Sequence, residues 1–270
     1  MPNDLAPESS PDPNADLDPD PDPEAFDELY PEYCPHVIRH PTMRMVWDQL
    51  TMLHWRYPAE EVQRLIPDRL TVETFDGSAW VGLVPFRMRI DVPVLPELPS
   101  ILHFPETNVR TYVTDRRGRP GVWFFSLEAS SPLAVAVART TYRVPYFWAD
   151  MSIEQPDGPD ERFVYRSTRR WPGPRGASSI VEVDVGPAFE PGRAGPLDRF
   201  LTARWALYGT LGPLTVRAEM FHERWPLHQA TVRRCDDELV AAAGLSQPTG
   251  EPVVHYSPGV NVRCGWPSRA

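Results

Sequence analysis

The sequence contains no lysine, because all 27 residues counted as lysine plus arginine are arginine. A lysine amine is the side-chain group that forms Schiff bases with carbonyl substrates, so imine chemistry on a side chain is excluded. The guanidinium of arginine does not replace it, since that group stays protonated in proteins. Any chemistry of this chain therefore uses other groups.

Cysteine and long apolar runs are also scarce. The three cysteines, Cys34, Cys235 and Cys264, form no C-x-x-C pair, which argues against a disulfide framework or a structural zinc site. No run of about 18 apolar residues occurs, and the N-terminus lacks both parts of a secretory signal. No Gly-rich phosphate loop follows a predicted strand. We expect a cytoplasmic protein that uses no metal or cofactor and contacts no membrane.

The negative charge is concentrated at the N-terminus. The net charge is −10, and residues 1–32 hold eleven of the 37 acids and no arginine. The remainder is near neutral and lacks the basic surplus of a nucleic-acid-binding domain. Repeated Asp-Pro units at residues 18–23 remove backbone donors and repel one another. We predict a disordered acidic arm over residues 1–35, as a solubilising tail or a docking arm for a basic partner, and one domain over residues 36–270.

Short strand-like runs separated by proline and glycine dominate the chain from residue 42 onward. Three short helices are predicted where Pro58, Pro132 and Pro196 stand at first helical positions. Many strands and few helices, without regular alternation, predict an α+β fold of mostly antiparallel β-structure. The strand-like runs are residues 78–86, 106–114, 121–129, 163–168, 179–185, 214–221 and 229–234.

The most informative stretch is residues 104–129, which predicts a hairpin with a polar turn at residues 115–120. Alternation places Glu106, Asn108, Arg110 and Tyr112 on one face. If the register centres near Arg117, the residues opposite the first three are Glu128, Ser126 and Phe124. Two carboxylates and a guanidinium would then share a face and set apart an acid and a base. A one-residue slip would move Glu128 to the other face, and the alternative is a surface ion-pair ladder.

Several short motifs follow one another over roughly residues 44–263. They include Leu53-His54-Trp55, Phe75-Asp76-Gly77, Ala79-Trp80-Val81, Phe104-Pro105-Glu106, Asn108–Val113, Gly121–Leu127, Pro145-Tyr146-Phe147 and His255–Val260. Together they resemble the YqjF-like family, a bacterial family of unknown function placed among acetoacetate-decarboxylase-like proteins.

This resemblance implies a β cone or barrel around a small-molecule cavity, with Glu106 inside it. In the decarboxylases an arginine-containing segment ends in Phe-Pro-Lys, and that lysine forms the Schiff base. The segment from Arg139 to Tyr146 looks like it, with Tyr146 in the place of the lysine. A phenol cannot form an imine, so the decarboxylase mechanism does not transfer. Relatives on the decarboxylase side form oligomers, which makes a homo-oligomer an expectation by analogy.

The candidate site combines these expectations. Glu106 would act as acid or base, and Arg110 or Arg139 would hold a carboxylate or enolate. The ligand would be a small carbonyl or carboxylate metabolite, open to enolisation, dehydration or cyclisation. The alternatives are a ligand-binding or sensor module without turnover and an assembly unit. The proposed substrate-binding residues are Asn108, Tyr112, Ser126, Glu128, Arg139, Tyr146 and His54.

Other histidines and cysteines admit more than one interpretation. His54 is either a base in the pocket or a packed, hydrogen-bonded histidine. His255 precedes a Pro-Gly turn and marks either a structural corner or the rim of a pocket. Cys34, His36 and His40 offer only three metal ligands beside the arm, and His222 and His228 lack the H-E-x-x-H spacing. These patterns do not indicate a metal site.

Overall fold

The computed structural model describes residues 23–91, 102–142, 144–156, 161–190, 192–212 and 214–270. Strands dominate and most of them pair antiparallel, which confirms the predicted α+β, mostly antiparallel fold class. The helices are α1 (Pro23–Leu29), α2 (Ala59–Gln63), α4 (Pro132–Val137), α5 (Pro196–Thr202) and α6 (Leu239–Ala242), with a π-helical turn η1 (Ala138–Tyr142). The strands are β1 (Met43–Tyr57), β2 (Leu70–Val72), β3 (Thr74–Phe75), β4 (Ser78–Asp91), β5 (His103–Asp115), β6 (Pro120–Ala129), β7 (Tyr146–Glu154), β8 (Arg162–Trp171), β9 (Ser178–Ala188), β10 (Ala206–Leu211), β11 (Leu214–His222), β12 (His228–Asp237), β13 (Val253–Cys264) and β14 (Ser268–Arg269).

Local sequence explains where the helices begin. Pro132 opens α4, and the side chain of Ser131 before it accepts a hydrogen bond from the Ala134 N–H. Pro196 opens α5, and the Asp198 carboxylate accepts from the Gly195 N–H at 2.7 Å. These caps satisfy backbone donors that a helix end leaves without partners. The cap of α5 also fixes the position of Asp198, which contacts His255.

A five-stranded antiparallel sheet in the order β6-β5-β4-β1-β13 forms the centre of the fold. Both of its edges divide. Along β6, β10 pairs in parallel with residues 122–123, whereas β7 pairs in parallel with residues 127–129. Along β13, β12 pairs with residues 255–256, whereas β11 pairs with residues 262–264. Each edge therefore continues into two different strands.

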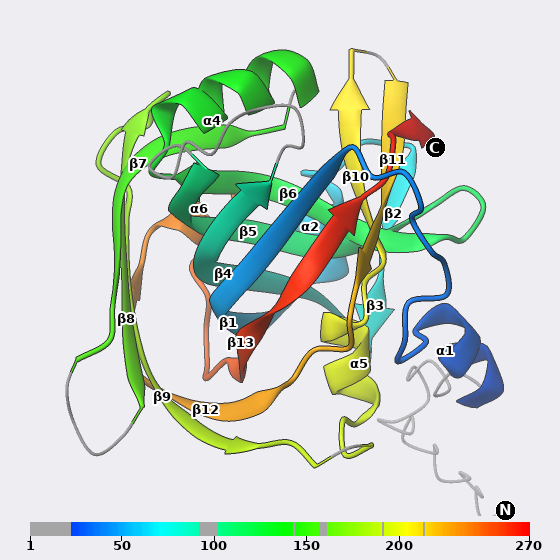
Figure 1. Ribbon diagram of the computed structural model, residues 1–270. Coiled ribbons are helices and arrows are strands. Elements are labelled where there is room, and N and C mark those ends of the chain that lie inside the picture. Colours follow the sequence, from blue (N-terminus) through cyan, green and yellow to red (C-terminus); the bar gives the residue numbers. More distant parts are fainter. Residues whose placement is uncertain (1–22, 92–101, 143, 157–160, 191, 213) are drawn as a thin grey trace, which may run out of the picture.

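The two continuations close on opposite faces of the central sheet (Figure 1). On one face β7, β8, β9 and β12 join β6 back to β13 and close what we call the larger barrel. On the other face β10 and β11 do the same and close the smaller barrel. The central sheet is thus a wall shared by two barrels.

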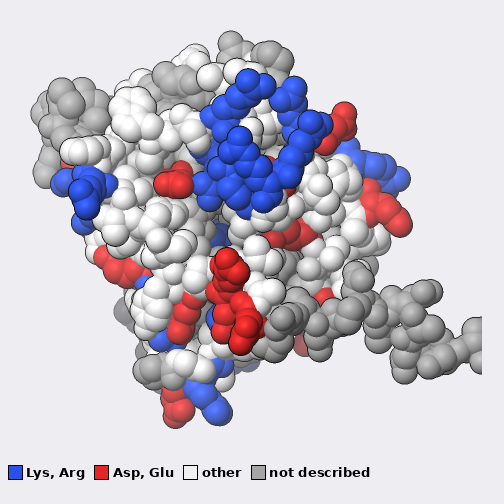
Figure 2. Space-filling model, turned by 90° about the vertical axis from the view of Figure 1, so that its right-hand side faces the viewer, with Lys and Arg blue, Asp and Glu red and all other residues white. Residues whose placement is uncertain are grey.

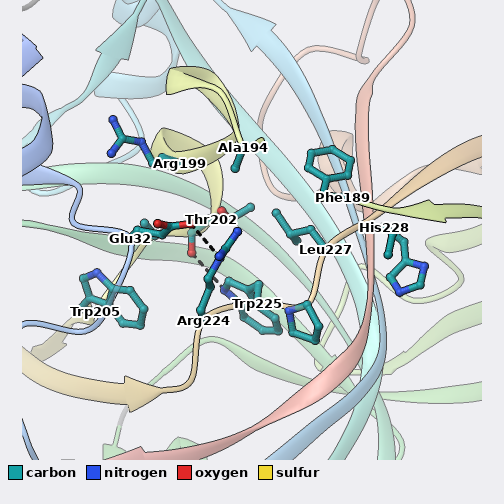
Figure 3. Close-up of a pocket in the computed structure, with 13 residues that line it drawn as sticks. Glu32, Phe189, Ala194, Arg199, Thr202, Trp205, Arg224, Trp225, Leu227 and His228 are labelled. Carbon is teal, nitrogen blue, oxygen red and sulfur yellow. Dashed lines mark hydrogen bonds and ion pairs between the residues drawn. The ribbon is translucent and has the colours of Figure 1, made fainter. Parts of the chain in front are cut away.

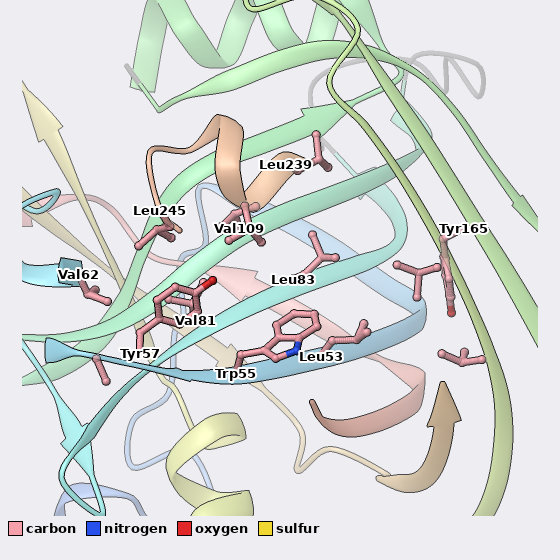
Figure 4. Close-up of a cluster of buried hydrophobic side chains, with 14 of the residues drawn as sticks. Leu53, Trp55, Tyr57, Val62, Val81, Leu83, Val109, Tyr165, Leu239 and Leu245 are labelled. Carbon is pink, nitrogen blue, oxygen red and sulfur yellow. The ribbon is translucent and has the colours of Figure 1, made fainter. Parts of the chain in front are cut away.

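Alternate side chains of the shared strands point into alternate barrels. Leu83 and Val109 lie in the cluster that fills the larger barrel with residues of β8, β9 and α6 (Figure 4). Val84 and Phe104 lie in the cluster of the smaller barrel, with Met220 of β11. Both interiors are largely apolar, so any polar group in them needs a partner.

The segment after residue 22 corrects part of the predicted arm. Residues 1–22 lie outside the described residues, but residues 23–29 form α1, on which Phe26 is buried against Phe75 and Phe200. Tyr30 is buried beside it and donates a hydrogen bond to Glu73 at 2.5 Å. The arm prediction relied on charge and proline and gave too little weight to these two aromatic residues. We call residues 23–36 the strap.

Charge is unevenly distributed on the outside of the molecule. Figure 2 shows arginine side chains gathered on the upper part of the face that is at the right in Figure 1, with acidic side chains gathered below them. No described helix is long and apolar enough to cross a membrane. The strap lies on the same face as the acidic group, where α1 is visible at the right of Figure 1.

Candidate functional site

A β-bulge decides which side chains of the predicted hairpin meet. Arg110 lies opposite Phe124 as predicted, but Phe125 is an extra residue in β6, and beyond it the pairing shifts by one. Glu106 therefore pairs with Ala129, and Asn108 pairs with Leu127. The predicted pairs of Glu106 with Glu128 and of Asn108 with Ser126 are wrong. The predicted pairs assume a regular hairpin without a bulge. No glycine in this part of β6 indicates that one is present.

The bulge sends Glu128 and Ser126 into the larger barrel. Glu128 is fully buried there and receives two hydrogen bonds from Arg169, at 3.1 and 2.5 Å. The Arg169 guanidinium also stacks on the ring of Phe147, 3.7 Å from its centroid. Burial raises the pKa of Glu128 against the opposing effect of Arg169. This closed ion pair is a structural element of the larger barrel, on the far side of the shared wall from Glu106.

Glu106 points into the smaller barrel and is only 2% exposed. Its carboxyl accepts a hydrogen bond from the Tyr146 hydroxyl at 2.9 Å. Burial raises the pKa of Glu106 to about 8, although the Tyr146 hydrogen bond acts in the opposite direction. Burial and the nearby carboxyl also raise the pKa of Tyr146. At neutral pH this pair is mostly an uncharged acid beside an uncharged phenol, so the alternative of a surface ion-pair ladder does not apply to Glu106.

Arg110 and Asn108 continue the same inward row of β5. The Arg110 guanidinium lies over the ring of Tyr112, 5.8 Å from its centroid, and its Nη2 is 3.5 Å from the Met52 sulfur. Among the described residues Arg110 has no carboxylate partner. The two most buried arginines differ in this respect, because Arg169 pairs with Glu128 and Arg204 pairs with Glu73.

His54 extends this row from β1, which lies on the other side of β4 from β5. It is fully buried, and its Nε2 lies 2.6 Å from the Tyr112 hydroxyl, which itself donates to the Leu201 carbonyl at 2.7 Å. Burial and the charge of Arg110 lower the pKa of His54 well below its usual range. Gly82 lies between His54 and Arg110, and a Cβ there would be 2.9 Å from the imidazole. The absence of a side chain at Gly82 is what lets His54 fit against β4.

His255 of β13 is a functional candidate that the sequence did not resolve. It is 1% exposed, and its Nε2 is 2.8 Å from Asp198 Oδ1. It pairs across the strands with Met52, whose side chain contacts Arg110. Hydrogen bonds from His255 and from the Gly195 N–H hold the pKa of Asp198 below its usual value against the effect of burial. No short sequence motif can contain this pair, because 57 residues separate His255 from Asp198.

Besides Trp47 Nε1 near the start of β1, four buried polar atoms on this inner face have no hydrogen-bond partner among the described residues. They are Asn108 Oδ1, Arg110 Nε, His54 Nδ1 and His255 Nδ1. Buried polar atoms in folded proteins are nearly always hydrogen-bonded, and a group of such exceptions in one place requires an explanation. All four belong to β5, β1 and β13, which face the same barrel interior. These atoms include a hydrogen-bond donor, Arg110 Nε, and an acceptor, Asn108 Oδ1.

Arg139 lies outside this group. Its Nη1 donates to the Tyr146 carbonyl at 2.7 Å, so it supports the backbone of Tyr146 instead of reaching Glu106. Its guanidinium stacks on Phe147 and Trp171, with centroids at 5.9 and 5.4 Å. It lines a surface cavity of about 860 Å³ between β10 and the start of β7. The structure therefore separates the two arginines that the sequence offered as alternatives.

Two further cavities flank the strap. One of about 260 Å³ lies beside α5, between Phe189, Trp205 and Trp225, and the Glu32–Arg224 ion pair closes one side of it (Figure 3). Another of about 450 Å³ lies between α1 and the turn of the β5–β6 hairpin. None of the three cavities is lined by Glu106 or Arg110. The side chain that lies against the Arg110 guanidinium is Met52, which is flexible enough to make way for a small ligand.

Most of the other histidines and cysteines considered as metal ligands contact backbone carbonyls instead. Cys34 and His36 both contact the Met220 carbonyl, and His222 contacts the Glu223 carbonyl. Within the described part of the chain no three His, Cys, Asp or Glu side chains are placed to hold a metal ion.

Comparison with known proteins supports the resemblance seen in the sequence. Residues 44–261 match the family model DUF2071, described as an uncharacterized conserved protein. The uncharacterized protein YqjF of Bacillus subtilis (strain 168) is 33% identical over 230 residues, which is 84% of this chain and 91% of that protein.

Solved structures share the fold at low sequence identity. An acetoacetate decarboxylase-like enzyme from Sphingomonas wittichii RW1 has a TM-score of 0.59 at 14% identity, over 86% of this chain and 93% of that one. The enduracididine biosynthesis enzyme MppR, complexed with pyruvate, has a TM-score of 0.61 at 13% identity, over 87% and 93%. Acetoacetate decarboxylase from Legionella pneumophila has a TM-score of 0.55 at 11% identity, over 90% and 95%. These likenesses confirm the predicted acetoacetate-decarboxylase-like architecture.

Proposed function

Because the chain belongs to the DUF2071 family of YqjF-like proteins and has an acetoacetate-decarboxylase-like fold, we propose that its smaller barrel binds a small carboxylate that also carries a carbonyl group. The proposed site consists of Arg110, Glu106, Asn108 and Tyr146, with His54 and Tyr112 supporting them. Its chemistry is non-covalent acid–base chemistry without a Schiff base.

The unpaired charge of Arg110 is the observation that carries this proposal. A guanidinium is always protonated, and that of Arg110 is half-buried at the wall of the smaller barrel, where its charge and its buried Nε favour an anion. Among the described residues no carboxylate compensates Arg110, and its Nε has no hydrogen-bond partner. A ligand carboxylate would supply both, because its two oxygens match the planar donors of a guanidinium.

Glu106 complements Arg110 in this proposal. With a pKa of about 8 it is mostly protonated at neutral pH and presents an O–H donor in place of a second negative charge. A protonated carboxyl can hydrogen-bond to a ligand carbonyl and stabilise the negative charge that develops there during enolisation. A charged Glu106 would instead repel the ligand carboxylate. Its protonation is therefore a condition for the site to accept an anion.

A thermal-shift titration with a panel of 2-oxo and 2-hydroxy acids, performed with pyruvate first, tests the proposal. We expect stabilisation that rises with ligand concentration and follows mass action. The Arg110→Gln variant should lose at least tenfold in affinity, because the bidentate ion pair is gone. Glu106→Gln should reduce the affinity for 2-oxo acids more than for simple carboxylates, since it changes only the carbonyl contact.

The matched control is Arg170→Gln, because Arg170 is about half exposed and pairs with Asp150 on the surface. It removes the same charge without touching the barrel interior, so affinity should stay at the wild-type value. Equal affinities of the wild type and Arg110→Gln would refute the site. Binding without any chemical change of the ligand would favour a sensor over an enzyme.

A further inference from the structure

We propose that His255, held by Asp198, is the proton acceptor of this site, and that its substrates are 2-oxo acids with a hydrogen on the carbon next to the carbonyl. This inference rests on the proposed function and deepens it from binding to a reaction. It assigns to the smaller barrel an acid, Glu106, a base, His255, and an anion holder, Arg110.

Asp198 fixes which nitrogen of His255 carries the proton. An ionised carboxylate only accepts hydrogen bonds, so the proton between Asp198 Oδ1 and His255 sits on Nε2. In the neutral imidazole Nδ1 then has a free lone pair. Asp198 is itself held by the Gly195 N–H at the start of α5, so the orientation of the imidazole is set by a backbone contact. A carboxylate in this position also stabilises the imidazolium that forms when Nδ1 takes a proton.

The free nitrogen belongs to the group of unpartnered atoms in the smaller barrel. His255 Nδ1 is buried and has no hydrogen-bond partner among the described residues. Its cross-strand neighbour Met52 contacts Arg110 through its sulfur. His255 is thus linked to the anion holder through a single flexible side chain, which is the group that a small ligand would displace.

The base and the acid lie on the same face of the shared sheet, because the side chains of His255 and Glu106 both point to the side of the smaller barrel. The smaller barrel consists of β13, β1, β4, β5, β6, β10 and β11, so β5 and β13 are three strands apart in one direction and four in the other. Seven strands about 4.8 Å apart, tilted by about 40°, enclose a diameter of roughly 14 Å. Side chains that reach inward by about 5 Å from each wall meet near the axis, so a ligand of a few heavy atoms has to displace side chains such as Met52.

His54 is a weaker candidate for the same role. Its Nδ1 is also free, but Nε2 contacts the Tyr112 hydroxyl instead of a carboxylate. Its nearest charged groups are cationic or can become so, namely Arg110, His255 and Arg204. Nothing there stabilises an imidazolium, whereas His255 has Asp198. Of the two histidines, only His255 has a partner that improves it as a base.

The surroundings of His255 limit access of water to the base. The ring of Phe189 packs at 5.8 Å from the imidazole, and Phe189 also lines the cavity beside α5. Trp225 and Leu227 form part of both the cavity wall and the apolar cluster of the smaller barrel (Figure 3). The apolar walls strengthen electrostatic contacts within the site, and release of the enol lets both the enol and the imidazolium exchange protons with the solvent.

The proposed step is a balanced proton transfer. The ligand carboxylate binds Arg110, and its 2-oxo group accepts a hydrogen bond from protonated Glu106. The Nδ1 lone pair removes a proton from C3, the C–H electrons form the C2–C3 double bond, and the carbonyl oxygen takes the proton of Glu106. The products are an enol, an imidazolium at His255 and a carboxylate at Glu106. The reverse step restores both residues, and no other reactant is needed.

Deuterium exchange of pyruvate tests this step directly. The full-length protein is incubated with pyruvate, and separately with 2-oxobutyrate, in D₂O, and loss of the C3 proton signals is followed by NMR. We expect exchange at least tenfold faster than in buffer for the wild type and a return to the buffer rate for His255→Asn. Binding of the two acids, measured by thermal shift, should change less than threefold in His255→Asn.

Asp198→Asn is the second variant, because Asp198 acts through His255. It should slow exchange while keeping binding, and it should change the ring ¹⁵N shifts of His255 from one fixed tautomer to a mixture. A purely structural role of Asp198 would change the tautomer signature without slowing exchange. His40→Asn, which removes an exposed histidine, is the matched control and should exchange like the wild type.

The outcomes separate this inference from the proposed function. Exchange that persists in His255→Asn, or that His54→Gln abolishes instead, overturns His255 as the base. Binding of both acids without any exchange above buffer overturns the reaction and leaves the binding site standing. Absence of binding and exchange with both acids overturns both proposals.

Discussion

At the scale of single residues, the ionisation of Glu106 links the site to stability. A glutamate titrates near pH 4.5 when unperturbed and near pH 8 in the folded protein. Between these values the folded state holds a proton that the unfolded chain has lost. The stabilising contribution is complete below pH 4.5 and disappears as pH rises through 8.

We therefore predict that the free energy of unfolding of the wild type falls between pH 5 and pH 8.5 by a few kcal/mol more than that of Glu106→Gln. Glutamine keeps the shape of the protonated acid and does not titrate, so the difference between the two proteins isolates this residue. Urea unfolding at four pH values in this range measures it. Parallel curves for both proteins would show that Glu106 is ionised in the folded state.

The buried pair on the other side of the wall leads to a second prediction at this scale. Glu128→Gln leaves the Arg169 charge buried without a counterion, and breaking a buried pair in this way costs about 3–5 kcal/mol. The matched exposed pair is Arg56–Asp76, where Asp76→Asn should cost less than about 1 kcal/mol. Urea unfolding at pH 7 gives both values. A loss for Glu128→Gln as small as that for Asp76→Asn would mean that the pair is solvated.

At the scale of elements, the β5–β6 hairpin shows how far the sequence could be interpreted. Alternation identified the strand and correctly grouped Glu106, Asn108, Arg110 and Tyr112 on one face. Which side chains oppose them depends on one extra residue at Phe125, and a bulge is a balance of packing on both faces that no local pattern reveals. The partner of His255 could not be predicted either, because only the packing of α5 near β13 brings Asp198 to it.

The strap was mispredicted because two aromatic residues outweigh its surrounding acids. Phe26 is 4% exposed in a cluster with Phe75 and Phe200. Removal of a buried phenylalanine ring costs about 3 kcal/mol or more, whereas an exposed aromatic residue costs less than about 0.5 kcal/mol. We predict this contrast for Phe26→Ala against Tyr33→Ala, since Tyr33 is exposed on the same segment.

Urea unfolding measures the contrast, and limited proteolysis provides an independent readout. Phe26→Ala should increase cleavage within residues 23–36, because its packing holds that segment on the barrel. If the two variants unfold at the same urea concentration, the strap contributes nothing to the folded state.

At the scale of the whole molecule, two barrels share five strands and therefore cannot unfold independently. Loss of either barrel exposes one complete face of β6, β5, β4, β1 and β13. We expect a single cooperative transition, although each barrel has its own hydrophobic cluster. This also tests the prediction of one domain over residues 36–270.

Far-UV circular dichroism reports the sheet, and tryptophan fluorescence reports both barrels through Trp55 and Trp225. Their urea transitions should coincide within error. Two separated midpoints would show that one barrel can open while the other stays folded, and the sheet would then have to support itself with one face exposed.

The shared wall also has a consequence for redesign of the protein. On β1, β4 and β5, away from the bulges, every second residue lines the larger barrel, and the residues between them line the smaller barrel. A combinatorial library confined to one set would remodel one interior and leave the chemistry of its neighbour in place. The interiors of the two barrels could therefore be redesigned separately, although they share five strands.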